Sequence, residues 1–416
     1  MSIPNFDEKL VKYAQLITKV GVNIQPQQVV ILYISVSQQK LAHLIVEEAY
    51  KLGAGKVIVK WSDSFNTRQF LTNAPEEFLT NIPDYQKAEA QYIAEHKAAR
   101  ISVMSDDPNA LGGVEASRIG AYQKALGKAN LPVRKATQNN DLSWTVVAAA
   151  GQEWAQKVFP DLSPKESVDR LWEEIFKTCH LNEGDDPVAV WQAHDQKLRS
   201  KAEWLNQEQF SALHYTAPTA DFTVGLPENH IWEAAGSLNS DGVEFMANMP
   251  TEEVFTAADC HRIDGYICST NPLSYAGSVL EGMRFEFKDG QIIKATAEKG
   301  QAVLDHLLTI PGAKSLGEVS LVPDPSPISQ SGITFFNTLF DENASDHLAL
   351  GSAYPTNVQG GTKMDDKTLM EHGLNVSETH VDFMVGSAQM NIDGIKKDGT
   401  IIPVFRNGDW ASTTPL

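Results

Sequence analysis

The sequence has little cysteine, little positive charge and no long apolar run. Its 416 residues include three cysteines, Cys179, Cys260 and Cys268, and an odd, widely spaced set makes neither a disulfide framework nor a zinc ribbon. No apolar run approaches the roughly 20 residues that span a bilayer, and the N-terminus lacks the basic and then apolar pattern of a secretory signal. These absences predict a soluble, reduced protein of the cytoplasm.

Basic residues are also few, with 34 against 53 acidic ones and a formal charge of −19. Nucleic acid and anionic membranes would be repelled by this charge, so neither is expected as a partner. The same charge suits a protein that holds metal cations or receives cationic substrates. The hydrophobic fraction of 42% is that of a globular protein and argues against disorder.

Two familiar motifs are missing as well. The turn after the first predicted strand reads SVSQQ over residues 35–39 and contains no glycine, so a phosphate-binding loop is poorly supported there. Nothing resembles the H-E-x-x-H pattern of many zinc peptidases. Any nucleotide or metal site must therefore be built differently.

The first half of the chain alternates apolar strands with helices, which predicts βαβ units and a parallel sheet. Its expected strands cover residues 27–36, 56–63, 100–107 and 143–150. Helices are expected over residues 38–55, 76–99 and 112–130, and again through residues 165–206. A chain of this length favours two domains.

After residue 206 strands and turns dominate, including two predicted hairpins with Asp-Gly turns at residues 282–300 and 390–408. The predicted fold class is therefore α/β, with an N-terminal parallel-sheet α/β domain at 1–206. A β-rich α+β domain at 207–416 follows, and it is expected to carry the catalytic chemistry.

Four stretches of the second domain combine strand character with acidic or imidazole groups: 248–256, 316–323, 346–355 and 380–386. Side chains alternate along a strand, so His380 and Asp382 face the same way. By the same rule Glu252 and its neighbour Glu253 face opposite sides of an extended segment. Glu318 lies among residues that favour burial, where a lone carboxylate is costly unless it is paired or bound to a cation.

Glu252, Glu318, His347, His380 and Asp382 together provide three carboxylates and two imidazoles, a mixture that suits zinc, cobalt or manganese. Five ligands, one of them bridging, suit two ions about 3.5–4 Å apart. Each candidate residue or pair also has a structural interpretation without metal. His380 and Asp382 could simply be hydrogen-bonded, Glu318 could lie at a strand edge, and Glu252 with Glu253 could begin a solvated helix. The remaining histidines, His194 among them, are expected to be surface or packing residues.

The order and spacing of the longer blocks that contain these stretches resemble the thermophilic-type metallo-aminopeptidases, peptidase family M29. The resemblance covers essentially the whole chain and includes FTVGLPENHIWEAAG, NMPTEEVFT, LGEVSLVP, DHLALGSAYP and HVDFMVGSAQMNIDG. It implies a cytoplasmic, homodimeric exopeptidase that releases N-terminal residues from peptide substrates. It also implies two divalent ions per chain, whether zinc, cobalt, manganese or magnesium.

Carried over by this resemblance, the metal ligands fall on Glu252, Glu318, His347, His380 and Asp382. The catalytic tyrosine of the family falls on Tyr354. Glu252 is chosen over Glu253 on its distance along the chain to Glu318. Glu253 would then orient a ligand or act as general base.

Two other readings stay open at this point. Another metal-assisted hydrolase, such as an amidase or a phosphoesterase, could use the same ligands, although the four stretches contain no Arg or Lys to balance a phosphate. A non-catalytic two-lobed binding protein could use the carboxylates as structural ion sites.

Overall fold

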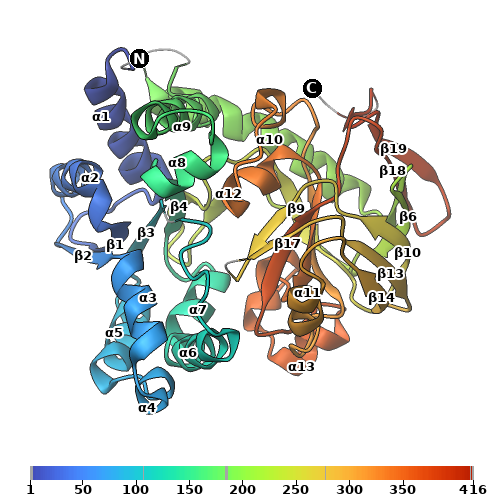
Figure 1. The fold of residues 1–416 in the computed structure, drawn as a ribbon. Helices are drawn as coiled ribbons and strands as arrows, with labels where there is room; N and C mark the ends of the chain where they lie inside the picture. Colours follow the sequence, from blue (N-terminus) through green and yellow to red (C-terminus); the bar gives the residue numbers. More distant parts are fainter. Residues whose placement is uncertain (1–2, 106, 183–185, 277, 413, 415–416) are drawn as a thin grey trace. The chain divides into compact units, whose positions relative to one another are not determined.

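The computed structural model describes residues 3–105, 107–182, 186–276, 278–412 and 414 (Figure 1). It contains two compact units, one formed by residues 1–192 with 236–249 and the other by 193–235 with 250–416. A parallel sheet in the first part and antiparallel sheets later confirm the predicted α/β class. The junction at 192/193 lies inside helix α10 (Pro187–Glu208). The domain boundary at residue 206 stays a prediction.

The first unit is built on a four-stranded parallel sheet with the strand order β2-β1-β3-β4. The strands are β1 (Val29–Ser35), β2 (Lys56–Ser62), β3 (Ala99–Met104) and β4 (Trp144–Ala148). Helix α2 (Gln39–Lys51) makes the crossover from β1 to β2, as the alternating pattern predicts. The short hairpin of β7 (Gly236–Leu238) and β8 (Glu244–Met246) also belongs to this unit.

The predicted helix over residues 76–99 is two helices, α4 (Glu76–Thr80) and α5 (Asp84–Glu95). Pro83 explains the break, because proline lacks the N–H that a helix interior needs and disfavours helical geometry in the residue before it. The unit's other helices are α1 (Phe6–Leu16), α3 (Ser64–Asn73), α6 (Ala116–Ala129), α7 (Leu131–Gln138), α8 (Gln152–Val158) and α9 (Pro164–Thr178). None of the described helices is both long and apolar enough to cross a membrane.

The second unit contains an antiparallel eight-stranded sheet with the order β14-β13-β10-β6-β5-β18-β19-β20. Its strands are β5 (Ala212–Ala217), β6 (Ala220–Gly225), β10 (Ile263–Cys268), β13 (Arg284–Lys288), β14 (Gln291–Thr296), β18 (Asn391–Ile395), β19 (Ile401–Arg406) and β20 (Asp409–Trp410). Both predicted hairpins are present. Asp289 and Gly290 turn the first with positive φ angles of 48° and 82°, the geometry that favours Asp-Gly.

A second sheet of this unit has four antiparallel strands in the order β17-β16-β15-β9. They are β9 (Val254–Ala257), β15 (Leu316–Leu321), β16 (His347–Gly351) and β17 (His380–Met384). Short helices lie between them in the chain: α11 (Gln301–Leu307), α12 (Thr338–Asp341) and α13 (Asp366–Glu371). The small hairpin of β11 (Leu273–Tyr275) and β12 (Ser278–Leu280) completes the described strands.

Candidate metal centre

The four stretches that the sequence marks as chemically unusual are neighbours in space. Each contributes one strand of the sheet β17-β16-β15-β9, so segments that lie between residues 254 and 384 of the chain come together in one sheet. Figure 1 shows this sheet in the second unit, with β9 in yellow and β17 in red. The four stretches therefore come together in space, as a metal site built from them requires.

Strand pairing places the candidate side chains on one face of the sheet. Ala349, on strand β16, pairs with Glu318 on one side and with Asp382 on the other. Directly opposed residues of an antiparallel pair point to the same face. His347 and Gly351 also lie on this face, because they are two residues to either side of Ala349. The face thus carries imidazoles and carboxylates around a small central residue.

Gly351 keeps the space beside His380 clear, since the two residues are cross-strand partners. Its φ angle is 105°, a conformation that non-glycine residues rarely adopt. A Cβ atom there would lie 2.2 Å from the carbonyl oxygen of Thr379. Only glycine therefore fits, and strand β16 presents small residues wherever the flanking strands present ligand-type side chains.

The polar side chains approach one another closely. His347 Nε2 lies 3.0 Å from Glu253 Oε2 and 3.6 Å from Glu318 Oε1. His380 Nε2 lies 3.3 Å from Asp382 Oδ1 and 3.6 Å from Glu318 Oε2. Glu318 thus faces one imidazole with each of its two oxygens. Two groups of three ligand-type side chains result, Glu253–Glu318–His347 and Glu318–His380–Asp382, and they share Glu318.

Backbone carbonyls fix the orientation of both imidazoles. His347 Nδ1 is 3.2 Å from the carbonyl oxygen of Ser345, and His380 Nδ1 is 2.7 Å from that of Ser352. A carbonyl oxygen only accepts, so each Nδ1 donates, and in the neutral ring Nε2 is left with a lone pair. These lone pairs face carboxylate oxygens, which also offer only lone pairs. A proton or a metal cation must lie between them, and a backbone-bound Nδ1 is characteristic of metal-ligating histidine.

Burial makes uncompensated negative charge in this cluster more costly. Glu318 and His347 are only 5% and 1% exposed. Burial raises the pKa of Glu318, and the charges of Asp382 and Glu253 add to that effect, although His347 and His380 oppose it. Burial lowers the pKa of His380, but the adjacent Asp382 carboxylate outweighs this and raises it to about 10. The cluster favours cations strongly.

Tyr354 stands at the edge of the same cluster. Its ring meets the ring of His380 edge to face, with the centroids 5.2 Å apart. Burial raises the pKa of Tyr354 well above its usual value, and the charges of Glu318 and Asp382 raise it further. The hydroxyl therefore keeps its proton at neutral pH and is able to donate a hydrogen bond.

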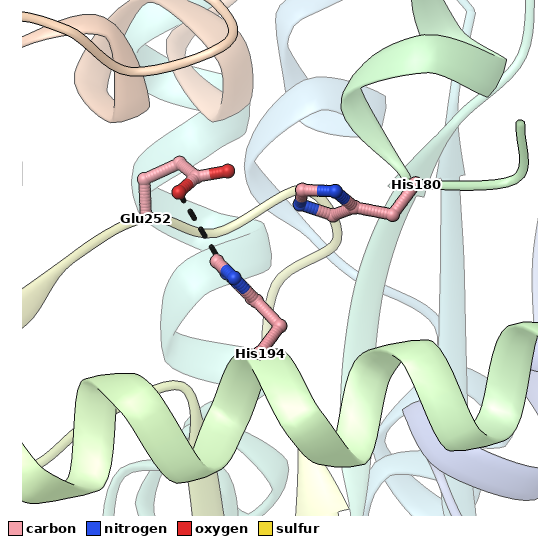
Figure 2. A group of neighbouring side chains, drawn as sticks. All are labelled: His180, His194 and Glu252. Atoms are coloured by element: carbon pink, nitrogen blue, oxygen red, sulfur yellow. Dashed lines mark ion pairs between the residues drawn. The ribbon is translucent and has the colours of Figure 1, made fainter. Parts of the chain in front are cut away.

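The structure places Glu252 and Glu253 in different surroundings. Glu253 Oε2 accepts a hydrogen bond of 2.6 Å from Ser320 Oγ and joins the cluster through His347. Glu252 lies with its Oε2 3.7 Å from Nε2 of His194, on helix α10 (Figure 2). Their opposite directions follow from the extended backbone that the sequence predicts. The expected ligand Glu252 is thus not among the side chains that surround Glu318, and Glu253 takes that place.

Two further acidic residues near the sheet were not singled out by the sequence. Asp346 fastens three strands, because its carboxylate accepts from the backbone N–H of Val322 and its carbonyl accepts from those of Val385 and Gly386. Burial raises the pKa of Asp346 to about 8. Glu342 is 8% exposed and lies close enough for the charges of Asp382 and Glu253 to act on it. Neither residue had a periodicity or motif that could have revealed it.

The donor set fits divalent transition metals. It offers carboxylate oxygens and imidazole nitrogens in two overlapping groups of three, and zinc, cobalt and manganese accept such mixtures. Within the described residues, no Lys or Arg nitrogen lies within ion-pair distance of Glu253, Glu318 or Asp382. The fold and this cluster are those of an α/β protein with a candidate metal centre.

Comparison with known proteins identifies the family. The sequence pattern of the thermophilic metalloprotease family, M29, matches residues 6–410. Aminopeptidase PepS of Streptococcus thermophilus is 55% identical over 412 residues, which cover 99% of this chain and 100% of that protein. Aminopeptidase AmpS of Bacillus subtilis is 49% identical over 98% of this chain and 99% of its own length. The chain belongs to the M29 family of metallopeptidases.

The fold agrees with this assignment. The structure of wild-type AmpT from Thermus thermophilus superposes with a TM-score of 0.91 at 38% sequence identity. The match covers 98% of this chain and 100% of that one. The predicted resemblance to this family is therefore confirmed over residues 6–410, and the predicted use of divalent metal is supported.

The small residue between Glu318 and Asp382 gives a direct test of the cluster. We expect Ala349→Leu to fill the space between the two carboxylates and to expel bound metal, with overpacking that lowers the free energy of unfolding by about 1–3 kcal/mol. Metal content after dialysis against zinc, measured by atomic emission, checks this. Leu350→Met, on the opposite face of the same strand, is the control and should keep its metal. Full metal content in Ala349→Leu would show that the ions are bound elsewhere.

Proposed function

We propose that this protein is a metal-dependent aminopeptidase that removes N-terminal residues from peptides by means of two divalent ions. The observation that carries the proposal is the shared carboxylate Glu318, which faces His347 with one oxygen and His380 with the other. A carboxylate between two ligand groups is the arrangement that holds two ions a short distance apart. The aminopeptidase names of PepS and AmpS support the same reaction.

The proposed ligand set differs from the sequence expectation at one position. Glu253 and His347 would hold one ion, His380 and Asp382 the other, and Glu318 would bridge them. Glu252 is replaced by Glu253 because only Glu253 lies beside His347, at 3.0 Å. The hydrogen bond from Ser320 orients the Glu253 carboxylate toward the cluster.

Divalent ions bound there would lower the pKa of a water molecule and polarise the carbonyl of the scissile peptide bond. The protein's own side chains would position the ligands and stabilise the developing negative charge. The Nδ1 hydrogen bonds of His347 and His380 hold both rings in place before the substrate arrives. Tyr354 would donate its hydroxyl hydrogen to the oxyanion that develops on the substrate carbonyl.

The other readings find less support. A phosphoesterase needs cationic side chains to balance its substrate's charge, and in the described part of the chain no Lys or Arg pairs with the carboxylates of the cluster. A binding protein with structural ions would not need a protonated tyrosine beside them. The proposal also includes a homodimer in the cytoplasm, which is supported by the family resemblance, and zinc, cobalt, manganese or magnesium as the metal.

The activity itself is tested by metal removal and reconstitution. We expect chelator-treated protein to lose hydrolysis of leucine 4-nitroanilide and to regain it with zinc, cobalt or manganese. The N-acetylated anilide should not be cleaved, because an aminopeptidase requires a free chain end. Release that survives complete metal removal, or equal cleavage of the blocked substrate, would refute the proposal.

The two adjacent glutamates provide a matched pair of variants. Glu253→Gln should lower metal affinity at least about tenfold, since even supporting groups of metal ligands contribute 10–100-fold, and activity should fall with it. Glu252→Gln changes the same backbone segment on its other side and should keep both ions. Calorimetric titration of each variant with zinc measures the difference. The reverse ranking would restore Glu252 as the ligand.

Tyr354→Phe separates catalysis from metal binding. Loss of one oxyanion donor should reduce kcat by about 10²–10³-fold, while metal content and KM stay near those of the unchanged protein. Steady-state kinetics and metal analysis on the same preparation give both numbers. A normal kcat would remove Tyr354 from the reaction.

A further inference from the structure

Phe255, on strand β9, lies on the same face of the four-stranded sheet as the candidate ligands. It pairs with Ser320 on β15, and Ser320 pairs in turn with His347 on β16. Directly opposed residues of antiparallel strands point to the same face, so these three side chains form one row across the sheet. Phe255 also follows Glu253 by two residues and points the same way. An aromatic ring is thus placed beside the polar side chains of the candidate metal centre.

Phe255 differs from the other apolar side chains of this face in its exposure. Strand register puts Ala257, Ala349 and Met384 on the same face. Each of these three is at most 1% exposed, whereas Phe255 is only half-buried. Binding sites for small molecules combine apolar or aromatic walls with a few polar groups. The accessible ring of Phe255 has the properties of such a wall.

The ring of Phe255 contacts the proposed oxyanion donor. It meets the ring of Tyr354 edge to face, with the centroids 6.2 Å apart, and Tyr354 meets His380 in the same way. In an aminopeptidase substrate, the carbonyl next to the scissile bond belongs to the N-terminal residue. The side chain of that residue is attached to the neighbouring Cα, so it projects close to Tyr354. Phe255 lies where it can contact this side chain.

The backbone of Phe255 is held on both sides. Strand β9 is an edge of its sheet and pairs with β15 on its inner side. On the outer side the N–H of Phe255 donates to the carbonyl of Glu233 at 3.0 Å, and the N–H of Glu233 donates to the carbonyl of Phe255 at 2.9 Å. A side chain on such a fixed backbone is placed more precisely than one on a loop. Its ring is therefore able to discriminate between ligands of different size.

We propose that Phe255 forms a wall of the pocket for the side chain of the substrate's N-terminal residue and so favours large apolar side chains over small ones. This inference rests on the proposed aminopeptidase function and names its substrate class. An apolar side chain placed against the ring leaves water and gains free energy in proportion to the area buried. Glycine and alanine bury too little area to gain as much. Phe255 is then a residue that sets the preference for the N-terminal residue.

The test compares substrates that differ only in the size of this side chain. In the metal-loaded Phe255→Ala variant, the ratio of kcat/KM for leucine 4-nitroanilide to that for alanine 4-nitroanilide should fall at least about tenfold, since even one methylene in an apolar pocket contributes that much. The value for the alanine substrate should stay near that of the unchanged protein. Val254→Ala is the control, because Val254 points to the opposite face and is 0% exposed. It should keep the ratio.

A larger ring should act in the opposite direction. Phe255→Trp keeps an aromatic side chain but narrows the pocket, so kcat/KM for phenylalanine 4-nitroanilide should fall at least about tenfold relative to alanine 4-nitroanilide. Zinc content should be unchanged in both Phe255 variants. An equal fall for every substrate would mean that Phe255 only positions Tyr354, and lost zinc would mean that it only supports the metal centre. Either result, or unchanged ratios in both variants, would overturn the proposal.

A binding measurement keeps this proposal distinct from the proposed function. If the unchanged, metal-loaded protein hydrolyses none of these anilides, the proposed function fails. Calorimetric titration with L-leucinol and with L-alaninol still examines Phe255 directly, because the two amino alcohols differ only in the side chain. Tighter binding of L-leucinol that is lost in Phe255→Ala supports the apolar wall. Equal binding of both amino alcohols to the unchanged protein contradicts it.

Discussion

Negative charge crowded onto one face of a four-stranded sheet is the constraint on which the rest of the second unit depends. Glu253, Glu318, Asp382 and Glu342 interact electrostatically where little water reaches, and such a group of carboxylates is stable only with cations among them. The two imidazoles can take up protons, yet their fixed Nδ1 hydrogen bonds turn Nε2 toward the carboxylates as metal ligands do. Metal bound at this cluster would therefore couple metal binding to folding stability.

Residues around the cluster leave space for it and hold its backbone segments in place. Strand β16 carries Ala349 and Gly351 between the strands that bear the candidate ligands, and these small residues leave space that larger side chains would fill. Asp346 fastens the ends of β15, β16 and β17 together through three backbone N–H groups. Asn343 accepts a hydrogen bond from the backbone N–H of Glu252 and so holds the segment that precedes Glu253. None of these residues needs to touch a metal ion, but each limits how far the ligands can move.

Much of the architecture could be predicted from the sequence. The apolar runs of the first half gave the parallel strands, because a strand buried on both faces has a continuous apolar pattern. Residue alternation correctly put His380 and Asp382 together, 3.3 Å apart, and set Glu252 and Glu253 in opposite directions. Residue alternation could not predict which of the two glutamates faces Glu318. That depends on which face of the sheet each side chain joins, and alternation alone does not determine it. Glu342 and Asn343 escaped notice for a related reason. They lie in a 3-10 turn, where side chains follow no strand or helix periodicity that would predict which way they point. Only the folded structure shows which residues lie near them.

The order of the ligand-bearing segments along the chain has a consequence for biosynthesis. Strand β17, which carries His380 and Asp382, is the last of the four to leave the ribosome, and it forms an edge of its sheet beside β16. A nascent chain that has emerged only as far as β16 holds an incomplete ligand set. Hydrolytic competence would thus be switched on near the end of translation, when most of the polypeptide has already been made.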